Sequence, residues 1–300
     1  MLFIQLLKQW DYILSLLRTI LTIFSSSYQF ACMRKTIASY SLCLIVIVAF
    51  SFILSCKTVP KPASSSTGTI SGYQLVWSDE FNGNTVDTTS WNFEIGGQGW
   101  GNHEQEYYQP NNATVSDGNL IITGRKEDVG ANHYTSSRMT TQGKHEFTYG
   151  RIEARIKMPV GQGFWPAFWM LGADIKTVGW PASGETDIME HINTDSLIYG
   201  TLHWDNNGHV QSGDTIASTP SGYHVYAVEW DASAIRWYVD KTKYHEVNIA
   251  NNVNSTDEFH QPFFILLNFA LGGDWPGQTI DDSKLPAKMY VDYVRVYKKK

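Results

Sequence analysis

The stretch Gly184-Glu185-Thr186-Asp187-Ile188-Met189-Glu190-His191 carries three carboxylates interleaved with β-branched and apolar residues. Acidic residues are poor strand formers, and a run of this kind most often forms a solvated polar face. The residues on either side favour a strand, however. The competing interpretation is therefore a strand that carries its acids for a chemical purpose.

Strand geometry relates the three carboxylates to one another. Because side chains alternate along a strand, Glu185 and Asp187 share a face and Glu190 would point to the other. A bulge with one extra residue near Met189 restores the parity and brings Glu190 to the same side. The two Glu backbones then lie roughly 13 Å apart at about 3.3 Å per step, and side chains that lean inward shorten the gap.

A retaining glycosidase requires two carboxyl groups about 5 Å apart, one as nucleophile and the other as acid and then base. Crowding of like charges raises some pKa values, so that one carboxyl group stays protonated while its neighbour is ionised. Asp187, between the two glutamates, would hydrogen-bond to the nucleophile. Geometry alone leaves open which glutamate plays which part.

The rest of the chain after residue 72 has the pattern of short strands and turns. Residues 151–158 and 289–297 alternate, residues 225–230 and 235–239 form a predicted hairpin, and 262–271 is an apolar run suited to an inner strand. No segment there keeps a helical period over three turns. The pattern predicts an all-β domain, a two-sheet antiparallel sandwich of residues 73–300.

Residues 180–191 closely resemble the active-site strand of glycoside hydrolase family 16, in the E-x-D-x-x-E form of its laminarinases, the endo-1,3-β-glucanases. Five further segments resemble that family in the same order: 75–82, 99–108, 163–172, 272–277 and 291–297. The resemblance implies a β-jelly roll whose concave sheet forms the substrate cleft. It also implies that Glu185 is the nucleophile, Asp187 assists it, and Glu190 is the acid/base.

A glucan cleft needs exposed aromatic rings for the flat sugar faces and fixed polar groups for the hydroxyl edges. The candidate platforms are Trp100, Trp165, Trp169, Trp180 and Trp275, and the candidate polar groups are Asn102, Glu104, Arg138 and His203. A single tryptophan in a β protein is more often a core residue, and Trp169 fits a core position as well. His203 fits a hydrogen-bonded sheet histidine equally well.

Three positions depart from the common family pattern: Thr186, His103 and Asp274. Thr186 is expected to point away from the cleft and to leave the chemistry unchanged. His103 and Asp274 flank the cleft aromatics, where they would influence the choice of substrate.

The resemblance also implies one structural calcium away from the cleft, at Glu80, Gly118 and Asp292. Calcium prefers oxygen ligands such as backbone carbonyls and an aspartate. Catalysis by paired carboxylates is expected to need no cofactor.

The first 72 residues differ from the rest. Residues 42–54 are an apolar run after Arg34 and Lys35, too short for an ordinary membrane span, and they resemble a secretory signal. Residues 53–56 resemble a bacterial lipobox, which predicts residues 1–56 as a leader and Cys56 as the lipidated residue; an uncleaved signal anchor is the alternative. Met33 is a natural start, so residues 1–32 are either an upstream mis-start or an additional leader. Residues 57–72 are a flexible spacer rich in Pro, Ser and Thr.

Composition agrees with export. All three cysteines lie in the leader, so the domain lacks disulfides and thiolate chemistry. Residues 73–300 contain 17 Lys and Arg against 28 Asp and Glu, a net charge of −11, which argues against nucleic acid as a partner. We expect a monomer that binds β-glucan, either secreted or held in the bacterial cell envelope, and that meets a membrane only through its lipid or signal anchor.

Together these features predict an endo-acting hydrolase of β-1,3-glucan that retains configuration. One alternative is the same fold acting on mixed-linked 1,3-1,4-glucan or on a galactan. The other is a glucan-binding sandwich without catalysis, which needs the aromatic residues but has no use for three carboxylates.

Overall fold

The computed structural model describes residues 70–300. The predicted leader at 1–56 with Cys56, and the spacer as far as residue 69, lie outside the described residues. Within residues 70–300, no helix has the length and apolar character needed to cross a membrane.

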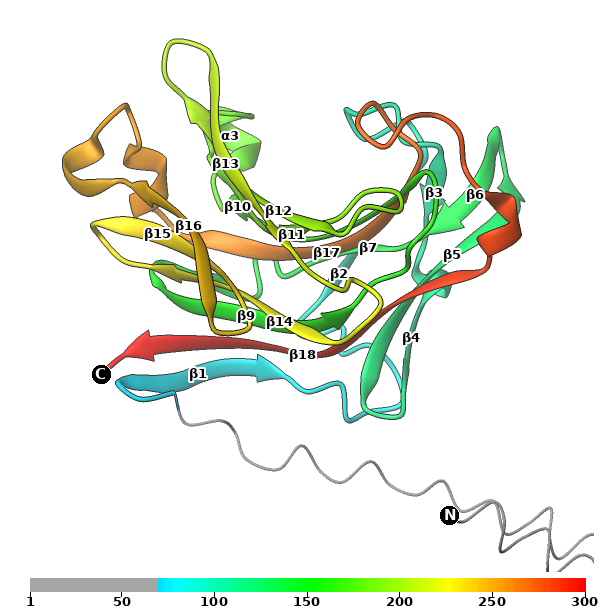
Figure 1. The fold of residues 1–300 in the computed structure, drawn as a ribbon, viewed down its shortest axis with the longest axis horizontal. Coiled ribbons are helices and arrows are strands. Elements are labelled where there is room, and N and C mark those ends of the chain that lie inside the picture. The colour runs from blue at the N-terminus through cyan, green and yellow to red at the C-terminus, as the bar shows by residue number, and fades with distance from the viewer. Residues whose placement is uncertain (1–69) are drawn as a thin grey trace, which may run out of the picture. The chain divides into compact units, whose positions relative to one another are not determined.

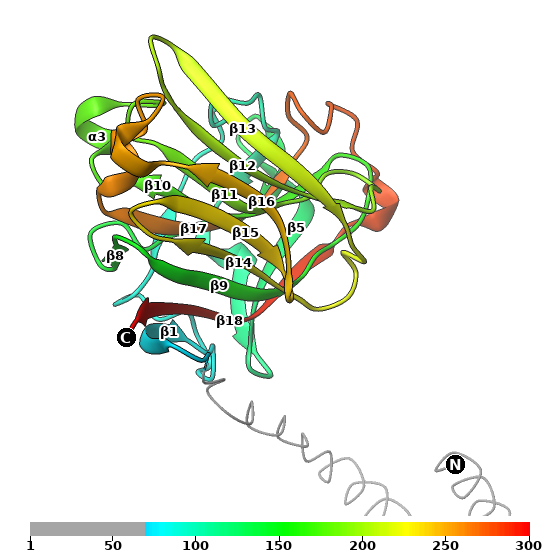
Figure 2. The same ribbon diagram turned by 60° about the vertical axis from the view of Figure 1, so that its left-hand side comes forward.

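Two β-sheets are stacked face to face, and Figures 1 and 2 show the curved inner sheet above the outer one. The outer sheet runs β16-β15-β14-β9-β18-β5-β6-β3, with β1 beside β18 and β4 beside β5. Its strands are β1 (Tyr73–Asp79), β3 (Glu106–Tyr108), β4 (Ala113–Ser116), β5 (Asn119–Val129), β6 (Asn132–Ser136), β9 (Gly150–Lys157), β14 (His224–Trp230), β15 (Ala234–Val239), β16 (Thr242–Asn248) and β18 (Ala287–Lys299).

The inner sheet runs β13-β12-β11-β10-β17-β7-β2, with β8 beside β17. Its strands are β2 (Asn92–Glu94), β7 (Arg138–Thr140), β8 (Glu146–Phe147), β10 (Phe164–Gly172), β11 (Glu185–Glu190), β12 (Leu197–Asp205), β13 (His209–Ala217) and β17 (Phe263–Leu271). The pairing between named strands is antiparallel except for β3 with β6, which is parallel. The predicted two-sheet sandwich is therefore confirmed, with that one exception to the antiparallel rule.

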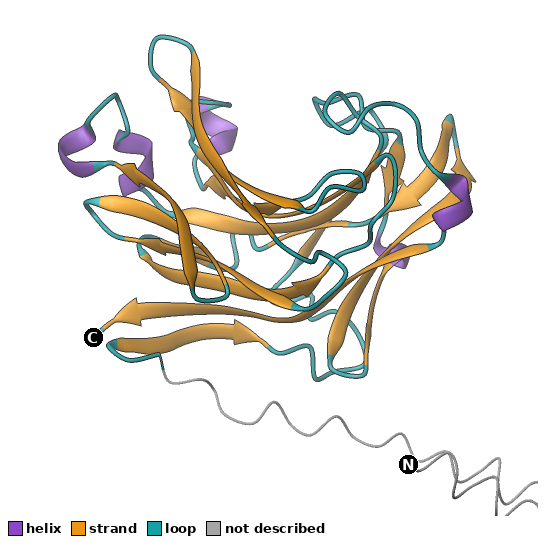
Figure 3. Ribbon diagram, in the orientation of Figure 1, coloured by secondary structure: helices purple, strands orange, loops and turns teal. Residues whose placement is uncertain are grey.

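Within residues 70–300, helical structure is confined to short turns, as Figure 3 shows. The turns are α3 (Ile175–Val178), η1 (Pro110–Asn112), η2 (Ala250–Asn252), η3 (Asp257–His260) and η4 (Asp282–Lys284). The sequence pattern, which lacked a sustained helical period, predicted this correctly.

The core lies between the two sheets. Ile152 and Ile156 of β9 pack in one buried cluster with Phe168 of β10 and with Leu267 and Phe269 of β17. Burial of this apolar surface, at about 25 cal/mol per Å², is the main stabilising contribution in a domain without disulfides. The face of β10 that is turned away from this core is left to form the floor of a cleft.

Candidate active site

Strand β11 carries the three carboxylates and is bulged. Against β10, Asp187 pairs with Trp169 and Met189 pairs with Phe168, so Ile188 has no partner. Against β12, the register also shifts between Asp187 and Glu190. The extra residue is where the parity argument placed it, and Ile188 and Met189 both turn into the core.

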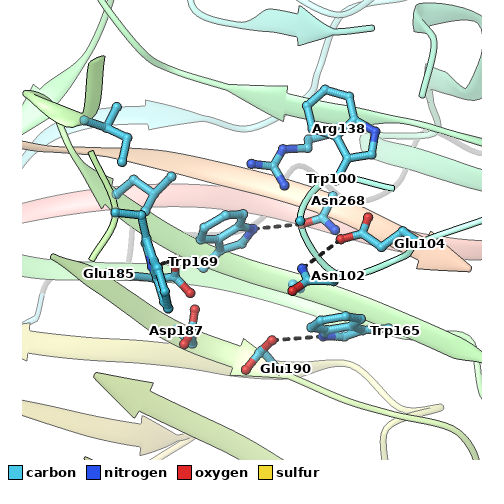
Figure 4. A pocket seen from close by; sticks show the side chains of 15 residues that line it. Trp100, Asn102, Glu104, Arg138, Trp165, Trp169, Glu185, Asp187, Glu190 and Asn268 are labelled. Carbon is cyan, nitrogen blue, oxygen red and sulfur yellow. Dashed lines mark hydrogen bonds between the residues drawn. The ribbon is translucent and has the colours of Figure 1, made fainter. Parts of the chain in front are cut away.

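The bulge puts Glu185, Asp187 and Glu190 on one side of the sheet. All three line a cavity on the concave face, and Figure 4 shows them in a row. Thr186, buried and pairing with Met170 and Leu202, does not line it, as expected. The predicted catalytic residues therefore meet in one cavity.

Two indoles hold the two glutamates. Nε1 of Trp180 donates to Oε2 of Glu185 over 3.0 Å, and Nε1 of Trp165 donates to Oε1 of Glu190 over 2.9 Å. A third indole, that of Trp237 on the outer sheet, donates to the main-chain oxygen of Asp187 over 2.7 Å. The two glutamate carboxylates are thus fixed by indoles of the cleft, and the backbone of Asp187 is fixed from the outer sheet, as a preorganised site requires.

Burial and mutual repulsion raise the pKa of all three carboxyl groups. Burial and the charge of Asp187 raise the pKa of Glu185 to about 8. Burial raises the pKa of Glu190 to about 7, although the Trp165 hydrogen bond opposes this. The pKa of Asp187 is also raised, first by burial and then by Glu190. The cluster therefore holds protons near neutral pH, and glycoside cleavage needs the form in which one glutamate is ionised while the other keeps its proton.

His203 lies beside the carboxylates, across the strand pair from Glu185. Its Nε2 is 3.0 Å from Oδ2 of Asp187, although that oxygen lacks a hydrogen bond of good geometry. Ligand atoms of Glu185, Asp187 and His203 lie within 4.8 Å of one another, and within residues 70–300 no other such group could hold a metal ion. Hydrolysis by paired carboxylates requires no metal.

A row of polar side chains crosses the inner sheet at right angles to its strands. Glu94 pairs with Arg138, Arg138 with Asn268, Asn268 with Ala167, and Ala167 with Glu190. Arg138 also forms an ion pair with Glu94. Sequence reasoning missed Glu94 and Asn268, because only the strand order places them in this row.

Arg138 lies between two of the predicted platforms. Its guanidinium is 5.1 Å from the centre of the Trp100 ring and 4.8 Å from that of Trp169. Nε1 of Trp169 donates to Asn268 over 2.8 Å. Trp169 lines the cavity, which resolves the open choice between core and cleft for this residue.

Asn102 and Glu104 lie at the cavity wall beside Trp100, as Figure 4 shows. Nδ2 of Asn102 donates to Glu104 over 3.1 Å, and the hydroxyl of Tyr108 donates to the other oxygen of Glu104 over 2.8 Å. Glu104 is thereby held as an acceptor at the wall. Tyr108 was missed because it is fully buried behind the loop.

Trp275 lines the cleft together with Glu190. Its ring lies 5.5 Å from that of Trp165 and 4.9 Å from that of Tyr199, edge to face in both cases. Tyr199 was not predicted, although it alternates with Thr201 and His203 on the same face of β12, and that spacing was a usable signal. All nine predicted sugar-binding residues line the cleft cavities.

The three predicted calcium positions lie on or next to neighbouring strands of the outer sheet. Glu80 follows β1, Gly118 precedes β5, and both strands flank β18 near Asp292. The carboxylate of Asp292 accepts from Arg155 over 2.7 Å, and that of Glu80 pairs with Arg295. Main-chain carbonyls and an aspartate suit calcium, and the site stays a prediction.

An open cleft has indole walls and three carboxylates on one strand, with Asp187 buried and the two glutamates half-buried. This arrangement defines a class of protein, a glycoside hydrolase that works with a pair of carboxyl groups. The sequence profile of glycosyl hydrolases family 16 matches residues 100–295. The chain belongs to that family. A second profile, that of the beta-glucan synthesis-associated protein SKN1/KRE6/Sbg1, matches residues 2–187.

Named relatives agree with this membership. The clotting factor G alpha subunit of Tachypleus tridentatus is 42% identical over 262 residues, which are 85% of this chain and 37% of that subunit. A beta-glucanase of Rhodothermus marinus is 42% identical over 248 residues, 75% of this chain and 85% of the relative. This chain therefore corresponds to about a third of the first relative and to most of the second.

Solved structures share the fold as well. The laminarinase catalytic domain of Thermotoga maritima superposes with a TM-score of 0.71 at 43% identity, covering 76% of this chain and 99% of that domain. The predicted jelly-roll architecture is confirmed by this likeness.

Proposed function

We propose that this chain is an endo-acting β-1,3-glucanase that hydrolyses laminarin-type glucan with retention of configuration. The observation that carries the proposal is the bulge in β11, which gathers Glu185, Asp187 and Glu190 in one indole-walled cleft. The likeness to a solved laminarinase supports the β-1,3 linkage. An open cleft supports endo action because it admits a chain from either end.

In the proposed reaction, Glu185 attacks the anomeric carbon while Glu190 protonates the leaving oxygen. Glu190 then removes a proton from water, which displaces Glu185 from the glycosyl-enzyme. Asp187 supports these two steps from between the glutamates: burial raises its pKa, so it keeps a proton that it donates in a hydrogen bond to the ionised Glu185. Its contact with His203 and the Trp237 hydrogen bond keep it in place.

The cleft supplies the contacts that a glucan chain needs. Trp165 and Trp275 offer ring surface on the Glu190 side, and Trp180 offers it on the Glu185 side. Arg138 and Glu104 offer a donor and an acceptor for hydroxyl groups. We assign the first group to stacking on sugar faces and the second to sugar edges.

Two alternatives differ in their use of the same cleft. An enzyme for mixed-linked 1,3-1,4-glucan or for a galactan would keep the carboxylates and prefer another polymer. A binding module would keep the tryptophans and show no turnover. The three carboxylates with raised pKa values favour catalysis, because a purely binding surface gains nothing from burying them.

The test is hydrolysis of laminarin, lichenan and agarose by residues 73–300, measured as new reducing ends. We expect laminarin to be cleaved fastest. Glu185→Gln and Glu190→Gln, which keep the shape of each side chain, should fold and lose about 100-fold or more of the activity. Faster cleavage of lichenan or agarose would overturn the substrate, and binding of laminarin without turnover would overturn the enzyme.

We further propose that the chain is exported and anchored through a lipid on Cys56. The lipobox-like residues 53–56 and the Pro- and Ser-rich spacer support this. Metabolic labelling with a fatty acid tests it: we expect label in the wild type and none in Cys56→Ser. Label retained in Cys56→Ser would reject the anchor.

A further inference from the structure

A second histidine lies behind His203 at the rim of the cleft. His209 is the first residue of β13, just after the turn from β12. Its Nε2 lies 2.8 Å from Nδ1 of His203, and the two rings are nearly parallel, 20° apart with centres separated by 5.1 Å. Because the opposite nitrogen of His203 faces Asp187 at 3.0 Å, a continuous chain of contacts links the catalytic strand to the exposed His209.

Proton positions explain what this contact does. Only one proton fits between Nδ1 of His203 and Nε2 of His209. With a proton on Nε2 of His203 facing Asp187, Nδ1 of the same ring is a hydrogen-bond acceptor and needs a donor. In the tautomer that we assign to this pair, the Nε2 hydrogen of His209 is that donor. If it is lost, the His203 ring can tautomerise or rotate, and either change removes the proton that faces Asp187.

His209 also touches the other support of the nucleophile. Its ring centre lies 4.5 Å from that of Trp180, tilted by 47°. Trp180 is 50% exposed, so this contact holds an indole that has solvent on much of its surface. That same indole donates to Oε2 of Glu185. One side chain therefore contacts the residue that faces Asp187 and the residue that binds Glu185.

We propose that His209 is a positioning residue for hydrolysis, which keeps His203 directed at Asp187 and Trp180 directed at Glu185. The inference rests on the proposed glucanase function and adds a residue to its mechanism. Because His209 acts through its neighbours and does not bind substrate, we expect its substitution to change kcat more than KM.

Two substitutions separate the two contacts. His209→Gln keeps an N–H donor at about the reach of Nε2 and loses the ring. His209→Phe keeps a ring against Trp180 and loses the donor. The matched control is His133→Gln on β6, an exposed histidine that pairs with Asp128 and does not line the cleft cavities. Because His209 is at the surface, all three variants are expected to fold, which circular dichroism and thermal melting check.

Steady-state kinetics on laminarin give the first result. We expect His209→Phe to lower kcat about fivefold, the effect of one lost hydrogen bond, with KM changed less than twofold. His209→Gln should restore at least half of the lost kcat, and His133→Gln should match the wild type. A wild-type kcat in His209→Phe, a rise in KM alone, or a His209→Gln enzyme as slow as His209→Phe would each overturn the proposal.

Imidazole ¹⁵N NMR spectra of the protein without substrate give the second result, which does not depend on turnover. We expect the Nε2-protonated form of His203 in the wild type and in His209→Gln, and its loss in His209→Phe. Unchanged His203 signals in His209→Phe would also overturn the proposal. A wild type that fails to cleave laminarin would reject the proposed function, whereas an active wild type with an equally active His209→Phe rejects the role of His209 alone.

Discussion

The indole of Trp165 on β10 donates its Nε1 hydrogen to Oε1 of Glu190 over 2.9 Å. Burial raises the pKa of Glu190, this hydrogen bond opposes the rise because it favours the ionised carboxylate, and the resulting pKa is about 7. An acid catalyst works only below its own pKa. The alkaline limit of activity is therefore set by burial and Trp165 together.

Trp165→Phe is predicted to move the alkaline limb of the kcat/KM profile upward by about one pH unit, because a hydrogen bond to the charged form is lost. Trp169→Phe is the control, since its indole donates to Asn268 and to none of the three acids. The measurement is the rate of laminarin hydrolysis from pH 4 to 10. An unmoved or lowered limb in Trp165→Phe would show that this bond does not tune the acid.

The pKa of Glu185 leads to a prediction about stability. The unfolded chain titrates this group near 4.5, and the folded chain near about 8. Between these pH values the folded state binds more protons than the unfolded state. The contribution of Glu185 to folding stability is therefore fully present below pH 4.5 and is lost as the pH rises toward 8. Glu185→Gln removes this loss. Its melting temperature relative to wild type should therefore increase between pH 5 and pH 9, by about 3 °C or more.

The same melting measurement on Glu146→Gln gives the control, because Glu146 is exposed and lies outside the cleft cavities. A difference between Glu185→Gln and wild type that is constant with pH would contradict the raised pKa.

Deletion of Ile188 tests the bulge. This residue has no partner on β10, so its removal leaves the pairing of Asp187 and Met189 intact and keeps Glu190 on the cleft face. The deletion empties a buried site and should destabilise the domain by about 2–5 kcal/mol. We expect the folded fraction to keep at least about a hundredth of the activity, the loss that a displacement of 1 Å produces.

Deletion of Thr186 is the matched change in the same strand. Thr186 is paired on both sides, and its loss turns Glu185 toward the core. No activity and a failure to fold are expected. An inactive but folded Ile188 deletion would show that the bulge does more than restore parity.

His103 and Asp274, two departures from the family pattern, face each other across the cleft loops at 2.9 Å. Their side chains are 82% and 62% exposed, so the pair is weak. Asp274→Asn should change KM for laminarin less than about fivefold. A larger change, measured in the same kinetic assay, would mean that this pair holds the two loops together or binds sugar directly.

The active-site strand could be predicted from the sequence, because the need for three acids on one face conflicts with the alternation of side chains along a strand. Three acids that must share a face cannot do so at positions 185, 187 and 190 without an extra residue, and Ile188 is that residue. The sheet order was beyond such reasoning. The row from Glu94 to Glu190 crosses strands that are far apart in the chain, and local patterns carry no information on that order.

His209 shows a different limit. Its residue type and its place near a turn are those of an ordinary surface histidine. Only the register of the hairpin, which sets Asp205 against His209 and His203 against Gln211, brings its ring to His203. Arg138, in contrast, came from a motif, and the structure adds its position between Trp100 and Trp169.

The anomeric form of the first product tests the central assignment most directly. Proton NMR recorded during the first minutes of laminarin hydrolysis, before mutarotation, distinguishes the two anomers of the new reducing end. Attack by Glu185 followed by water activated by Glu190 predicts the β anomer first, with the α anomer growing in later. If the α anomer comes first, water attacks the sugar directly, and Glu185 is not the nucleophile.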